Sequence, residues 1–178
     1  ELNNDGKITE ADQEWIYDPT PDFTYGFNIY LEYKNFDFTA FFQGVQGVDI
    51  ISDLKKETDI WAGLNIGFLN KGRRLLDAWS ATNPNSNIPA VSLSDNNNEK
   101  RVSSYWVENG SYLKLRTVQI GYNVPKSFAQ KLAMERLRFY LSAQNLFTVK
   151  SSSFTGVDPE NPNYGYPIPL NITFGLNV

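Results

Sequence analysis

Strict alternation of apolar and polar residues is the dominant pattern along the chain. Between residues 23 and 33 every second side chain is apolar, starting with Phe23 and ending with Tyr33. The same alternation restarts at Phe36, after the two residues Lys34 and Asn35. A period of two over this length predicts a long β-strand with one apolar and one more polar face. Two such strands around a tight polar turn predict a β-hairpin.

The alternation returns three more times, within residues 111–122, 137–147 and 171–178. In the first of these segments the apolar positions change from odd to even numbers near Arg116 and Thr117. One extra residue at that point would keep all of them on one face, so the sequence predicts a β-bulge there. We therefore expect an all-β protein, built as an antiparallel meander of about five long amphipathic strands.

The segments between the strands alternate in length. The 34–35 turn is short, and the 123–135 connector is moderate, with a helical turn expected between Phe128 and Met134. The leading segment and the segments 44–104 and 151–170 are long, and a short helix is expected within 71–79. In a meander, short and long connections then lie at opposite ends of the sheet, as in transmembrane β-barrels. A soluble β-sandwich or jelly roll also has alternating strands and is the alternative.

Composition removes several classes of function. The 16 Lys and Arg residues are outnumbered by 20 Asp and Glu residues, so a basic nucleic-acid-binding surface is not expected. The chain has no Cys and no His, which excludes disulfides, thiolate nucleophiles, imidazole-dependent triads and the common zinc sites within it. No carboxylate pair is selected by its spacing either. We therefore expect no enzyme.

The first twelve residues resemble a calcium-binding loop. In the EF-hand template, alternate oxygen donors and a central glycine curl around one ion. Gly6 occupies the glycine position, and the matching ligands are Glu1, Asn3, Asp5, the backbone carbonyl of Lys7, Thr9 and Asp12. Glu1 is longer and Asp12 shorter than the template residues, which would weaken or reshape the site. The sequence predicts one structural Ca²⁺; the alternative is an Asn- and Asp-rich turn without an ion.

Several blocks of sequence together resemble one family. They read YGFN at 25–28, FFQGVQG at 41–47, YWVENGSYLKLR at 105–116, QIGYNVP at 119–125 and SAQNLF at 142–147. Their order is similar to that in the C-terminal β-barrel segment of SusC/RagA-type TonB-linked outer-membrane transporters. This resemblance implies a transmembrane barrel of about 22 strands, of which the chain supplies the last five or so.

The resemblance also implies a function and partners. Such proteins import oligosaccharides or oligopeptides across the Gram-negative outer membrane, with an N-terminal plug, energy from TonB and a SusD-like surface lipoprotein. The chain would then divide into a calcium-like loop and connector at 1–22, a barrel hairpin at 23–46, a long external loop at 47–104 and the last three barrel strands at 105–178. It would lack the plug and the TonB-contacting segment, and its long loops would face the cell exterior.

A different function remains open from the residues alone. The chain could be a soluble calcium-binding β-rich module that binds carbohydrate or mediates adhesion. Aromatic rings stack on sugars, and the tryptophans that could do so are Trp61, Trp79 and Trp106. Tryptophan also marks membrane interfaces and packs in cores, so these three residues are candidates for substrate contact only.

Overall fold

A five-stranded antiparallel sheet dominates the computed structural model, which describes residues 4–7, 9–59, 71–92, 101–162 and 165–178. The strand order across the sheet is β1-β2-β5-β6-β7, so successive long strands are neighbours. The strands are β1 (Phe23–Tyr33), β2 (Phe36–Gln46), β5 (Tyr112–Asn123), β6 (Arg138–Lys150) and β7 (Asn171–Asn177). The predicted meander of five long strands is confirmed.

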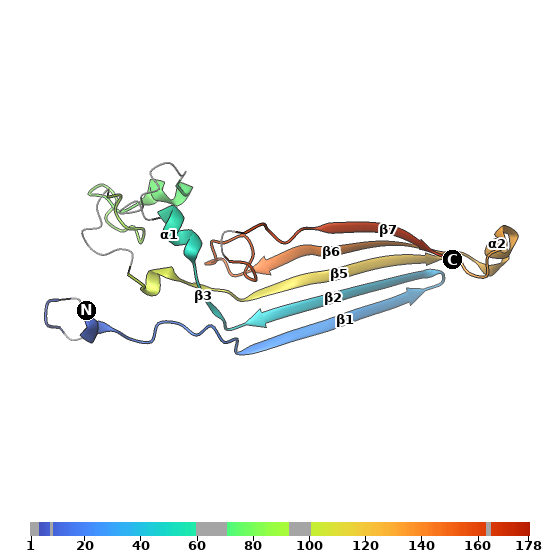
Figure 1. Cartoon of the computed structure of the whole chain (residues 1–178), viewed down its shortest axis with the longest axis horizontal. Coiled ribbons are helices and arrows are strands. Elements are labelled where there is room, and N and C mark those ends of the chain that lie inside the picture. Colours follow the sequence, from blue (N-terminus) through green and yellow to red (C-terminus); the bar gives the residue numbers. More distant parts are fainter. Residues whose placement is uncertain (1–3, 8, 60–70, 93–100, 163–164) are drawn as a thin grey trace.

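The two ends of the sheet differ as expected from the connector lengths (Figure 1). One end, here called the turn end, carries the tight β1–β2 turn and the short helices α2 (Lys126–Ala129) and η4 (Gln130–Leu132). The other, here called the loop end, carries the N-terminal segment and the long connections. Lys34 in the tight turn has a φ of 55°, a left-handed conformation that an L-residue adopts only at some cost.

A small two-stranded sheet at the loop end was not predicted. It pairs β3 (Asp49–Ile51) with β4 (Val107–Asn109), which lie just beyond β2 and just before β5. The helix α1 (Asp53–Asp59) follows β3, and the 3₁₀ turn η3 (Ser104–Trp106) precedes β4. Strands of three residues show no periodicity, which explains why the sequence pattern does not reveal them. The helix expected within 71–79 is the 3₁₀ turn η2 (Arg73–Asp77).

The register divides the five-stranded sheet into two faces. One row of paired residues runs across all five strands on what we call the apolar face: Leu31, Phe38, Ile120, Leu141 and Phe174. The adjacent row on the polar face contains hydroxyl and amide side chains, such as Thr39, Gln119, Ser142 and Thr173. The apolar face is largely uncovered, and 70% of Phe174 is exposed.

The predicted β-bulge lies at Arg116. The register of β5 skips this residue in its pairing with β2 and with β6, between Leu115 and Thr117. The apolar residues on both sides of the bulge consequently share one face, as the sequence predicted. β6 has its own irregularity opposite the bulge, where Asn145 has a φ of 55°.

Among the described residues, none of the helices has the length and apolar character needed to cross a membrane.

Candidate functional site

The polar face carries an ion pair near the turn end. Arg138 on β6 donates from Nη2 and Nε to the two carboxylate oxygens of Asp37 on β2, at 2.5 and 3.0 Å. Asn123 on β5 donates a further hydrogen bond to Asp37 at 3.2 Å. The pair spans the intervening strand at Gly121, where a Cβ would lie 2.5 Å from both Asp37 oxygens. Glycine at this position is therefore what lets the two side chains meet.

A larger cluster lies on the same face near the loop end. Lys114 on β5 is only 1% exposed, and its Nζ donates to both oxygens of Asp158 at 2.7 Å. It also donates to Oε2 of Glu160 at 2.6 Å. The other Glu160 oxygen accepts from the Tyr112 hydroxyl and from the Arg116 guanidinium. Two cations thus hold two carboxylates, and the cluster has no net charge.

The environment of Glu160 fixes its charge state. Burial alone would raise the pKa of this carboxyl group, but hydrogen bonds from Lys114, Tyr112 and Arg116 outweigh burial and hold its pKa below the ordinary value. Glu160 is therefore ionised at neutral pH. A carboxylate that is paired in this way positions a loop and is unsuited to act as a general acid.

The elements beyond the sheet form what we call the platform, comprising β3, α1, η2, η3 and β4. At its centre Glu108 is buried, and Lys55 from α1 lies 3.2 Å from its Oε1. Tyr105 from η3 donates its hydroxyl to Asp59 at 2.7 Å, and Arg74 from η2 pairs with the same carboxylate at 2.9 Å. Burial, together with the Asp59 carboxylate, raises the pKa of Tyr105, so its hydroxyl remains a donor. These contacts join segments that are remote in sequence.

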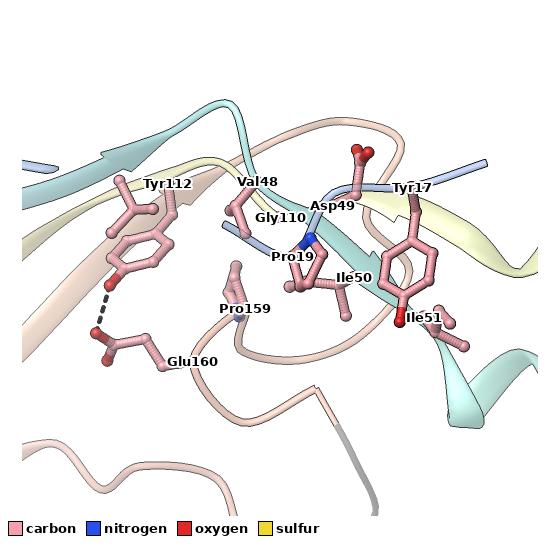
Figure 2. A pocket seen from close by; sticks show the side chains of 11 residues that line it. Tyr17, Pro19, Val48, Asp49, Ile50, Ile51, Gly110, Tyr112, Pro159 and Glu160 are labelled. Carbon is pink, nitrogen blue, oxygen red and sulfur yellow. Dashed lines mark hydrogen bonds between the residues drawn. The ribbon is translucent and has the colours of Figure 1, made fainter. Parts of the chain in front are cut away.

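A hollow of about 530 Å³ opens where the sheet meets the platform (Figure 2). Its walls include Tyr17 and Pro19 from the N-terminal segment and Val48 and Ile50, which lie before and within β3. Tyr112 and Pro159 also line it. Figure 2 shows the Tyr112 hydroxyl directed to the Glu160 carboxylate at its edge. Because that carboxylate is already partnered, the hollow presents mainly apolar and aromatic surface.

The structure describes only part of the calcium-like segment. Glu1 and Asn3 lie outside the described residues. Gly6 has a φ of 80°, as a sharp loop requires, and Lys7 donates its amide to Asp5 at 2.8 Å. Thr9 and Asp12 form a capping box around the 3₁₀ turn η1 (Glu10–Asp12). Within the described ranges, three or more acidic residues do not gather into a metal-binding group, so the Ca²⁺ site stays a prediction.

The three tryptophan candidates have different environments. Trp61 lies outside the described residues, and Trp79 is 48% exposed after η2. Trp106 is 1% exposed, packs against Ile51 and Tyr105, and donates its indole N–H to the Arg101 carbonyl at 2.8 Å. It has no free ring face on which a sugar could stack, so its assignment as a substrate contact is wrong and its role is packing in the platform.

The sequence analysis missed the residues that the structure brings together most closely. Lys114, Asp158 and Glu160 were not singled out, because the two acidic residues lie more than forty positions along the chain from the lysine. One signal was present: a lysine inside an otherwise well-patterned strand requires a partner when its face is covered.

The outer strands β1 and β7 each have one hydrogen-bonded neighbour in the sheet. Among the described residues, no element covers the outer backbone edges of these two strands or the apolar face of the sheet. An open edge of this length is a template for pairing with a further strand. The geometry therefore fits one section of a larger closed wall better than a finished sheet.

Comparison with known proteins shows which family of proteins the chain resembles. No family model matches the chain. The TonB-dependent receptor P3 of Formosa agariphila is 38% identical over 194 aligned positions, which cover 100% of this chain and 18% of the receptor. The SusC protein of Bacteroides thetaiotaomicron, also a TonB-dependent receptor, is 27% identical over 99% of the chain. The chain is a segment of SusC/RagA type.

Solved structures agree with the curated relatives. The RagAB peptide importer in its closed-closed state superposes with a TM-score of 0.73 and 27% identity, over 90% of this chain. A second RagAB peptide transporter structure gives a TM-score of 0.67 and 30% identity over 81% of this chain. The chain spans 17% and 15% of these two structures, respectively. TonB-dependent receptors are outer-membrane β-barrel proteins, so the five strands of this SusC/RagA-type segment are strands of such a barrel.

Proposed function

We propose that the chain is a non-catalytic part of a TonB-dependent outer-membrane importer, and that its five strands are the C-terminal section of the barrel wall. The observation that carries this proposal is the division of the sheet into two faces. The row from Leu31 to Phe174 is apolar across all five strands, whereas the adjacent row is polar. A wall between lipid and an aqueous lumen needs this arrangement.

The orientation follows from the ends of the sheet. Barrels of this kind have short turns in the periplasm and long loops outside. The loop end, with the platform and the hollow, then faces the cell exterior, and the turn end faces the periplasm. A SusD-like lipoprotein would meet the exterior loops. TonB would act on a part of the importer that lies outside this chain.

The substrate class is proposed as oligosaccharides or oligopeptides. The peptide alternative is supported by the similarity to the RagAB structures, which are those of a peptide importer and a peptide transporter. The chain's own support is the mainly apolar and aromatic hollow near the loop end. The hollow and the exposed Trp79 suit both an apolar peptide side chain and a sugar ring, because both pack on aromatic surface.

Spin labels on neighbouring residues of a central strand test the barrel assignment. Leu141 and Ser142 on β6 point to opposite faces, and β6 is paired on both sides. In the longer protein reconstituted in phospholipid vesicles, a label at Leu141→Cys should be quenched by lipid-dissolved oxygen. A label at Ser142→Cys should be quenched by a water-soluble nickel chelate. Equal quenching of both labels by the nickel chelate would refute the barrel and favour the soluble module.

We also propose that residues 1–12 hold one structural Ca²⁺. This proposal rests on the spacing of oxygen donors and on the left-handed Gly6. Calorimetric titration of the chain with calcium should give a binding heat that is lost in Asp5→Ala. Glu10→Ala is the matched control, since Glu10 is not among the proposed ligands, and it should keep the heat. Equal heats from wild type and Asp5→Ala would remove the proposal.

A further inference from the structure

The segment 151–162, which follows β6, lies folded against the polar face, although it belongs to one of the long exterior connections. We call it the β6 loop. Asp158 and Glu160 reach back to Lys114 and Arg116 on β5, both of which lie on the polar face. Lys150, at the end of β6, donates to the Gly156 carbonyl and lies 5.0 Å from the centre of the Phe154 ring. Phe154 is itself buried.

A second attachment joins the same loop to the platform. The Thr155 amide donates to Oε2 of Glu108 at 3.1 Å, and its hydroxyl donates to Oε1 at 2.6 Å. Glu108 is buried and also pairs with Lys55 of α1. The β6 loop thus contacts the barrel wall through Lys114 and the platform through Glu108. Together these contacts satisfy every one of the loop's described carboxylates with a cation.

We propose that the β6 loop is a fixed strut that ties the exterior platform to the barrel wall, locked by Lys114 between Asp158 and Glu160. In the importer assigned above, on which this inference rests, the strut keeps the platform and the hollow at one position on the luminal side of β5. A loop fixed in this way cannot swing out when substrate enters. Movement at the exterior mouth must then come from other segments.

Loss of Lys114 should destabilise the β6 loop, because this lysine is buried. Removing one partner from a buried ion pair leaves an uncompensated charge in a place that water reaches poorly. Gly156 adds a steric constraint, since a Cβ there would contact the Phe154 ring. The short backbone turn is closed by the Glu160 amide bonding to Oδ1 of Asp158 and the Asn161 amide bonding to its carbonyl. These two amides report directly on whether the lock is closed.

Hydrogen exchange followed by mass spectrometry tests the strut in the longer protein in phospholipid vesicles. The peptide covering residues 152–162 should be protected in wild type. In Lys114→Met, exchange in this peptide should rise by roughly 100-fold, because loss of the buried cation releases the loop. Peptides from residues 138–143 should not change. Lys126→Met is the matched control, since Lys126 lies on α2 at the turn end, and it should leave the loop protected.

Two results would overturn the strut. The first is a wild-type β6 loop that exchanges as fast as an unstructured peptide, which needs no variant and so decides the matter even if Lys114→Met fails to assemble. The second is unchanged loop protection in Lys114→Met. Asp158→Asn, which keeps the side-chain volume, provides an independent measurement and should also raise exchange. Failure of the barrel assignment would appear in the spin-label experiment and not in these rates, so the two hypotheses are separable.

Discussion

Gly121 gives the sharpest quantitative prediction, because it lies beneath the ion pair between Asp37 and Arg138. In Gly121→Ala the new Cβ would lie 2.5 Å from each Asp37 oxygen, so the pair must separate. The two side chains are only 12% and 15% exposed, and one partner lost from such a pair costs about 3 kcal/mol. Replacing a strand glycine by alanine returns about 0.5–1 kcal/mol. We expect a net loss of about 2 kcal/mol in the free energy of unfolding.

A double-mutant cycle separates this effect from a general cost of the added methyl group. In an Arg138→Met background the pair is already absent, so Gly121→Ala should cost less than in wild type, by about 1–2 kcal/mol. The free energies come from guanidinium unfolding of the longer protein in phospholipid vesicles, followed by the gel mobility of folded and unfolded forms. If Gly121→Ala costs the same in both backgrounds, the ion pair is not what the glycine accommodates and the reasoning fails.

Three further predictions concern single residues outside this pair. Lys34→Gly should raise the free energy of unfolding by about 1 kcal/mol in the same assay, because Lys34 has a φ of 55° that glycine adopts without strain; a lower stability would contradict this. Because its folded pKa is lowered, Glu160 stabilises the loop above its unfolded pKa, and that contribution should be lost as pH falls through the folded pKa. A pH series of exchange in residues 152–162 should show this step, and Glu160→Gln should lose it while Lys114, Arg116 and Tyr112 remain. In intact cells an impermeant maleimide should label Val157→Cys, at an exposed loop position, and not Phe128→Cys on α2; the reverse result would invert the proposed orientation.

Prediction from sequence succeeded where a local pattern determines the structure. The alternation at 23–33 and the change of parity near Arg116 correspond directly to β1 and to the bulge, because strand side chains alternate faces. Prediction failed where the structure depends on contacts between remote segments. Glu108 meets Thr155 only after β4 and the β6 loop are in place. Trp106 was misassigned for the same reason, since burial by the platform cannot be read from its neighbours in sequence.

The bulge at Arg116 has a consequence for how β5 tolerates insertions and deletions. Upstream of the bulge the even-numbered residues face the polar side, and downstream they face the apolar side. Deleting Arg116 would remove the extra residue and restore continuous alternation, and both halves of the strand would keep their faces, at the cost of the Arg116 contacts with Gln43 and Glu160. Deleting a residue elsewhere in the strand, such as Gln119, while the bulge stays in place would make the residues on one side of the deletion exchange faces. The bulge position should therefore tolerate a one-residue deletion better than the rest of β5.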